Sequence, residues 1–180
     1  MSITERLARV RELLTRHGLD GWLFVGGTAP DPALGAVFRV PPPAHATRLH
    51  AYFVPTDGEP VRLQHAIEPE ALAALPGADW RYPTRVHWEK ALTALFEPGG
   101  NVAVQYSPRG ALPRMDALPA GLMELAREHG LKPVSSAPLL AELAALTPAE
   151  IAQHERAAAI LTAAVQGTFL EGAPVLPVSA

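Results

Sequence analysis

The chain has 180 residues, 48% of them hydrophobic, which suits one globular domain of ordinary size with an appended segment. Its formal net charge of −3 and isoelectric point near 6.1 give no general attraction to nucleic acid or to an anionic membrane. The absence of cysteine excludes disulfides, thiolate metal sites and a cysteine nucleophile, and it agrees with a cytoplasmic protein. The apolar runs are short and broken by proline or charge, so we expect no membrane span.

The first predicted elements are a helix and a buried strand. Ser2 and Glu5 have the spacing of a capping box, in which each side chain accepts a hydrogen bond from the other residue's backbone amide. Gly18 can end the helix because it tolerates the left-handed conformation. The run 21–25 is continuously apolar, as in a strand buried on both faces. The helix itself is predicted from apolar residues at three- and four-residue spacing: Ile3, Leu7, Val10, Leu13 and Leu14.

The middle of the chain predicts a loop and then a hairpin. The stretch 28–46 is expected to be a loop because five prolines interrupt it. Residues 49–54 and 61–65 read as strands on either side of turn residues 55–59, which predicts a β-hairpin.

Helices and strands are then expected to alternate as far as Leu146. Helices are predicted over 70–75, 86–96, 119–129 and 138–146, and strands over 80–82, 102–106 and 132–135. This alternation implies an α/β layered fold, and the hairpin makes its sheet mixed rather than purely parallel.

The segment after Leu146 has a different character. Thr147, Pro148 and Glu150 give a second N-terminal helix signal, and an apolar stripe continues for about six turns. We therefore divide the chain into a domain over 1–146, a linker helix over 147–171 and an irregular tail over 172–180. The stripe comprises Ile151, Ala158, Leu161, Val165 and Phe169.

The histidines do not predict a metal site. His45 and His50 are five residues apart, and His65 and His87 are isolated in the sequence. None of these four forms the same-face pair of a helical zinc site. His154 and Glu155 begin like the HExxH motif, but alanine occupies the place of the second histidine. We interpret them as helix-surface residues.

Other candidate sites are equally weak in the sequence. Gly26-Gly27 could cradle a phosphate, but a turn is favoured because the rest of a phosphate-binding motif is missing. Ser107 precedes proline in a turn and forms no nucleophile elbow. The acids Asp20, Asp31, Asp57 and Asp79 fall mostly in turns, and the tryptophans Trp22, Trp80 and Trp88 favour core packing over a stacking surface for nucleic acid. Residue chemistry alone thus indicates a mixed α/β domain with no visible active site.

Several segments, in their order and spacing, resemble one protein family. The first helix with residues 17–23 is similar to the usual entry of its N-terminal domain, and 146–151 with 155–160 is similar to the linker that opens its catalytic half. Between them, the similar segments are 48–55, 58–61, 65–68, 104–109 and 134–137. Over about residues 2–171 the chain resembles the N-terminal domain of the creatinase/prolidase/aminopeptidase P family of pita-bread metallopeptidases, in an aminopeptidase P-like bacterial subgroup.

The resemblance implies a fold for this domain and a role that is separate from catalysis. It implies a three-layer, ribonuclease-H-like domain with a mixed sheet, which helps to form dimers or tetramers and narrows access of proline-containing peptides to a neighbouring active site. In that family a separate catalytic domain holds two divalent metals (Mn, Co or Zn) through two Asp, one His and two Glu, and a metal-activated water attacks the Xaa-Pro amide. Those ligands lie downstream of the linker helix. No catalytic, cofactor-binding or metal-binding residue is therefore transferred to this chain, and we expect it to bind no metal and cleave no peptide by itself.

Three functional interpretations follow. The first is an oligomerising and substrate-gating domain of an Xaa-Pro peptidase. The second is half of a peptidase site that another chain completes. The third is a stand-alone protein-binding module that lost the peptidase half. Residues 175–180 do not resemble the family's continuation, which suggests a truncated product, a frameshifted gene or a stand-alone domain.

Overall fold

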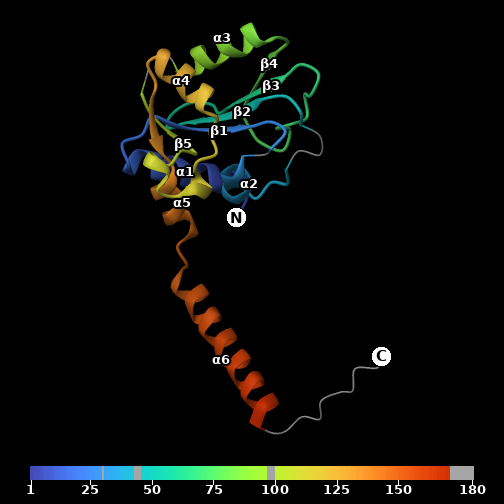
Figure 1. Cartoon of the computed structure of the whole chain (residues 1–180), viewed down its shortest axis with the longest axis vertical. Coiled ribbons are helices and arrows are strands. Elements are labelled where there is room, and N and C mark those ends of the chain that lie inside the picture. Colours follow the sequence, from blue (N-terminus) through green and yellow to red (C-terminus); the bar gives the residue numbers. More distant parts are fainter. Residues whose placement is uncertain (30, 43–45, 97–99, 171–180) are drawn as a thin grey trace. The chain divides into compact units, whose positions relative to one another are not determined.

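A six-stranded sheet forms the centre of the first of two units, Met1–Leu143 and Ala144–Ala180, in a computed structural model that describes residues 1–29, 31–42, 46–96 and 100–170 (Figure 1). The strands are β1 (Gly21–Gly26), β2 (His50–Pro55), β3 (Val61–His65), β4 (Ala78–Tyr82), β5 (Asn101–Val104) and β6 (Lys132–Ser135). Their order across the sheet is β4-β3-β2-β1-β5-β6. β2 is antiparallel to both β1 and β3, whereas β1–β5, β5–β6 and β3–β4 are parallel. The predicted hairpin and mixed sheet are confirmed.

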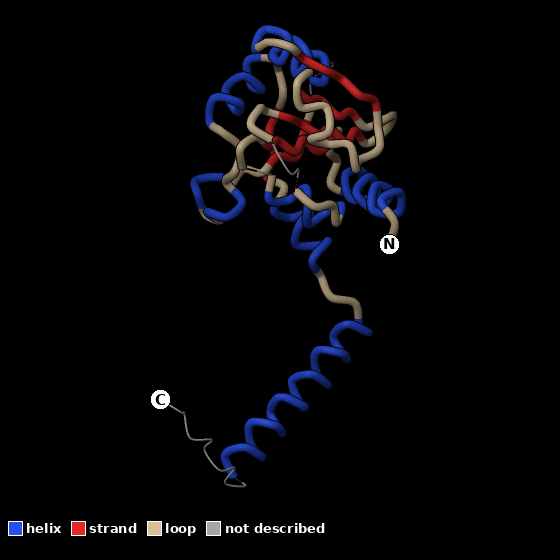
Figure 2. The backbone as a smooth tube through the Cα atoms, turned by 90° about the vertical axis from the view of Figure 1, so that its right-hand side faces the viewer, coloured by secondary structure: helices blue, strands red, loops and turns tan. Residues whose placement is uncertain are grey.

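Helices cover both faces of the sheet and make a three-layer α/β fold (Figures 1 and 2). The helices α1 (Ile3–Arg16), α2 (Pro32–Phe38) and α5 (Ala137–Ala144) lie on one face, and α3 (Arg85–Phe96) and α4 (Ala120–Glu128) lie on the other. The side chains of β1 alternate between the two cores: Trp22 and Phe24 pack with α1 and α2, and Leu23 packs with residues of α3 and α4. Trp88 is buried in the second core, so the core interpretation of Trp22 and Trp88 is confirmed.

The ends of α1 follow the sequence signals. The Ser2 amide donates to a Glu5 carboxylate oxygen at 2.6 Å, and the Glu5 amide donates to Ser2 Oγ at 3.2 Å. Gly18 has φ +62°, which an L side chain adopts only with strain. The predicted capping box and helix stop are confirmed.

Two predictions for the connections are wrong. The expected loop over 28–46 contains α2, because Asp31 caps its N-terminus and Pro32 occupies the first turn without losing a needed donor. The expected helix over 70–75 is instead a series of turns, in which the amides of Ala73 and Leu75 donate to carbonyls three residues earlier. The amide of Leu72 donates to Gln64 Oε1 of β3 at 3.1 Å, so a bond to the sheet replaces the bond that a helix would form.

The second unit contains α6 (Pro148–Leu170). Its predicted capping box is confirmed, since Thr147 N donates to Glu150 Oε2 at 2.8 Å and Glu150 N donates to Thr147 Oγ1 at 3.3 Å. The division of the chain into 1–146, 147–171 and 172–180 stays a prediction, and residues 171–180 lie outside the described part. No helix among the described residues is long and apolar enough to cross a membrane.

Candidate functional site

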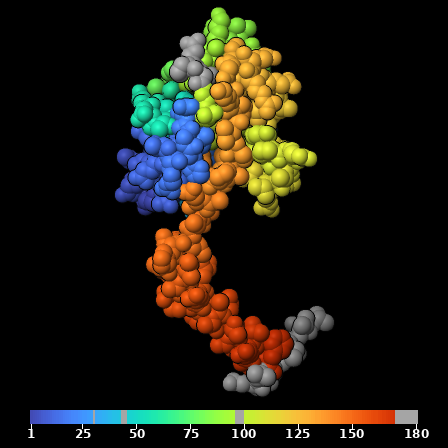
Figure 3. Space-filling model, turned by 90° about the vertical axis from the view of Figure 1, so that its left-hand side faces the viewer, coloured from blue at the N-terminus to red at the C-terminus, as the bar shows by residue number. Residues whose placement is uncertain are grey.

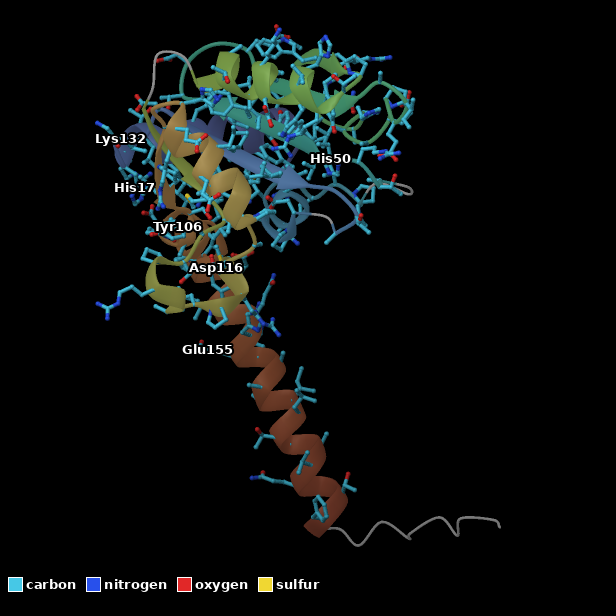
Figure 4. All side chains as sticks on the ribbon, turned by 45° about the horizontal axis from the view of Figure 1, so that its top comes forward. His17, His50, Tyr106, Asp116, Lys132 and Glu155 are labelled. Carbon is cyan, nitrogen blue, oxygen red and sulfur yellow. The ribbon has the colours of Figure 1, made fainter. Side chains whose placement is uncertain are left out.

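The residues singled out from the sequence as possible metal ligands do not gather in the structure. Within the described ranges, no three His, Asp or Glu side chains are grouped so that they could hold a metal ion. His154 and Glu155 are exposed on α6, as the surface interpretation expected. His45 lies outside the described residues. Figure 4 shows His17 and Lys132 toward one side of the first unit and His50 toward the other.

The other candidates from the sequence have structural roles. Gly26 ends β1, and the Gly27 amide donates to the Ala29 carbonyl, in agreement with a turn. Ser107 lies beside a turn of 3-10 helix over Pro108–Gly110, and its Oγ accepts from the Leu112 amide at 2.8 Å. The hydroxyl has no basic partner among the described bonds, so it is not prepared for nucleophilic attack.

Asp31 differs most from its sequence interpretation. It is 6% exposed and caps α2: its Oδ1 accepts from the amides of Ala33 at 2.8 Å and Leu34 at 3.1 Å. Its Oδ2 accepts from the Val25 amide at 2.9 Å, which ties the helix to β1. Asp79 also departs from a turn, since it lies in β4 and accepts from Gln64 and Arg81.

A buried polar network continues from Asp31 through Gln105. Gln105 Nε2 donates to both Asp31 oxygens at 2.6 Å, and Gln105 Oε1 accepts from Trp22 Nε1 at 3.1 Å and from Ser136 Oγ at 3.3 Å. Burial raises the pKa of Asp31, while the bonds from Gln105 and the three backbone amides oppose that rise. Every polar atom named here has a partner, so the network fixes where α2 and α5 meet the sheet.

Gln105 also anchors an exposed loop. The amides of Ala117 and Leu118 donate to the Gln105 carbonyl at 3.0 and 2.8 Å. Between these anchors the segment 107–118 protrudes from the surface, and it appears in yellow in Figure 3. Arg109 in this loop has φ +59°, a conformation that costs a residue with a Cβ about 1 kcal/mol.

His50 is a buried polar residue outside this network. It is 1% exposed at the start of β2, and its Nδ1 donates to the Arg48 carbonyl at 3.4 Å. Burial lowers the pKa of His50, whereas the Arg48 carbonyl and the Glu68 carboxylate act in the opposite direction. Gly26 makes room for the ring, because a Cβ there would lie 2.5 Å from His50 Nε2. Packing against His50 therefore explains the glycine at position 26 of the Gly26-Gly27 pair.

A cavity of about 230 Å³ lies beside Asp31 and His50. Its walls come from α2, from the segment that follows α2 and from the turns after β3, and they include Leu34, Gly35, Val40 and Leu72. The sequence did not indicate that Asp31 and His50 are buried side by side at a cavity. The Asp31-Pro32 pair was a usable signal, since it is an N-cap followed by proline at the first helical position.

Comparisons with known proteins concern the fold. No family model and no curated protein sequence matches the chain. Among solved structures, the chain is similar to a prolidase from Thermococcus sibiricus, with a TM-score of 0.62, 16% identity, and coverage of 96% of this chain and 45% of that one. It is similar to the creatinase/prolidase N-terminal domain of an X-Pro dipeptidase from Streptococcus pyogenes (0.52, 17% identity, 77% of this chain and 98% of that one). It is also similar to a Creatine-N superfamily domain of a dipeptidase from Streptococcus thermophilus (0.54, 15% identity, 79% and 98%).

These similarities establish the fold class. The chain has the fold of the creatinase/prolidase N-terminal domain, as expected from the sequence. It spans less than half the length of the whole prolidase that it matches, 45% of that chain.

Proposed function

We propose that the chain acts as the N-terminal, non-catalytic domain of an Xaa-Pro aminopeptidase- or prolidase-like metallopeptidase, where it promotes oligomerisation and gates the access of proline-containing peptides. The observation that carries the proposal is the match of its three-layer unit to nearly the whole of two isolated N-terminal domains, 98% of each. A cytoplasmic location is part of this proposal, in keeping with the cysteine-free sequence.

The described side chains support a role other than catalysis. The buried acid Asp31 already accepts hydrogen bonds from three backbone amides and Gln105, so it has little capacity left for a metal or a reacting water. In this proposal the two divalent metals and the reaction belong to a catalytic domain.

The surface of α6 supports the part of the proposal that concerns oligomerisation. Several large apolar side chains of α6 are exposed, among them Leu161 at 66% and Phe169 at 81%. Such a surface favours contact with another protein surface, and a twofold contact buries the same patch on both copies.

The test is metal binding and peptide hydrolysis by the purified chain. Titration calorimetry with manganese, cobalt and zinc should give no stoichiometric uptake, and Xaa-Pro peptides should stay intact in the presence of each metal. A tight site for one or two metal ions, or turnover of an Xaa-Pro peptide, would contradict the proposal. Turnover only after a second, complementary chain is added would instead favour a shared active site.

A further inference from the structure

The cavity beside α2 combines an apolar wall with one polar side-chain atom that accepts no hydrogen bond from the described residues. Leu34, Val40 and Leu72 supply apolar surface, and Gly35 leaves space where another residue would project a side chain. The volume of about 230 Å³ exceeds the roughly 150 Å³ of an apolar cavity that holds benzene. A molecule with a single ring therefore fits.

The two polar side chains of the wall differ in what they can offer a ligand. Asp31 accepts hydrogen bonds on both oxygens from the protein itself, so a ligand gains little from it. Among bonds between described residues, the His50 ring makes only one, from Nδ1 to the Arg48 carbonyl. Because a carbonyl can only accept, Nδ1 carries the proton and Nε2 of the neutral ring is an acceptor.

The chemistry of the wall selects the class of ligand. The buried carboxylate of Asp31 disfavours an anion. A charged amine would lose its hydration against a mostly apolar wall without gaining a free carboxylate oxygen. A neutral hydroxyl would satisfy the acceptor of His50 without either cost.

We propose that this cavity binds an uncharged molecule of single-ring size, of the phenol or cyclic-alcohol class, whose hydroxyl donates a hydrogen bond to Nε2 of His50. The site lies within Met1–Leu143 and does not depend on the proposed peptidase context.

The test is titration of the ¹⁵N-labelled full chain with phenol and with anisole, in which a methyl group replaces the donated hydrogen. Phenol should shift the amides of Gly35, His50 and Leu72 saturably at millimolar concentration. Anisole should bind about fivefold more weakly, which is the effect of one hydrogen bond. In His50→Leu the two probes should bind equally.

A second pair of variants tests the place of binding. Gly35→Leu should abolish the shifts by filling the cavity; its Cβ would be 3.4 Å from the Val40 carbonyl, an ordinary contact. Gly121→Leu in α4 should leave phenol binding intact, because a Cβ there meets nothing within 4 Å. If His50→Leu does not fold, as judged by amide dispersion, the Gly35 and Gly121 pair still decides.

Three results would overturn the proposal. The first is equal affinity of the parent chain for phenol and anisole. The second is saturable shifts centred on residues outside the cavity wall, or none at all. The third is tighter binding of benzylammonium than of phenol, which would assign the site to cations.

Discussion

The apolar stripe of α6 leads to a quantitative prediction about self-association. Leu161, Val165 and Phe169 follow one another at every fourth residue and span roughly 80° of the helix surface. Their exposed fractions are 66%, 54% and 81%. Complete burial of a large apolar side chain contributes roughly 1.5–3 kcal/mol, so burial of the exposed parts contributes about 4 kcal/mol per copy. We expect two copies to pair through this stripe.

The size of the effect follows from the same side chains. Two stripes gain about 8 kcal/mol together and association costs at least about 4 kcal/mol in lost translational and rotational freedom. The remaining stabilisation of about 4 kcal/mol corresponds to a dissociation constant of about 1 mM. Leu161→Glu with Phe169→Glu removes two of these three side chains and forces four charges into the contact. This double substitution should weaken the dimer by about 5 kcal/mol, more than a thousandfold.

Static light scattering over a concentration series that extends to about 1 mM measures the mean mass. The mean mass of the parent chain should rise above 19.1 kDa as the concentration increases, and that of the double variant should stay at 19.1 kDa. Gln153→Glu with Ala163→Glu is a matched control: it adds the same charge at positions about 120° and 160° from the centre of the stripe. The mass of this control should rise with concentration as that of the parent chain does. A parent chain that stays monomeric up to about 1 mM, or a mass unaffected by the stripe variant, would refute the reasoning.

Two further predictions concern the buried polar residues. Asp31→Ala should lower the free energy of unfolding by about 3 kcal/mol, because it removes the α2 cap and leaves buried amides and Gln105 without an acceptor. Urea unfolding measures this change, and the exposed control Asp57→Ala should alter the free energy by less than about 0.5 kcal/mol. The folded-state pKa of His50 lies below its ordinary value of 6.5, so the unfolded chain binds more protons and stability should fall as the pH drops through that value. His50→Leu should flatten this dependence between about pH 5 and 7, and equal slopes in the parent and His50→Leu would contradict the assignment.

Local sequence signals predicted the parts of the fold that local chemistry determines. The capping boxes of α1 and α6 need only a hydroxyl and a carboxylate three residues apart, and both formed. The β2–β3 hairpin likewise follows from alternating strands around turn residues. In α2 the signal was also present, because Leu34, Val37 and Phe38 share a helical face after the Asp31-Pro32 cap, but the surrounding prolines outweighed it.

The candidate site depends on contacts between residues far apart in the sequence, and so it could not be predicted. Gln105 is 74 residues from Asp31, and nothing near either residue indicates that they bond. His50 is buried because Gly26 on the neighbouring strand leaves room for its ring. The turns after β3 failed as a helix for a similar reason, since the bond from Leu72 to Gln64 is a tertiary contact.

The similarity in fold at 16% identity has a simple physical origin in β1. This strand must be apolar on both faces because a core lies on each side, and Trp22, Leu23 and Phe24 satisfy that requirement by alternation. Many other apolar triplets would do so equally well, since a core tolerates substitutions that keep volume and pattern. The pattern therefore preserves three layers without preserving any functional side chain. Function must be argued from specific sites, here the exposed stripe of α6 and the cavity beside His50.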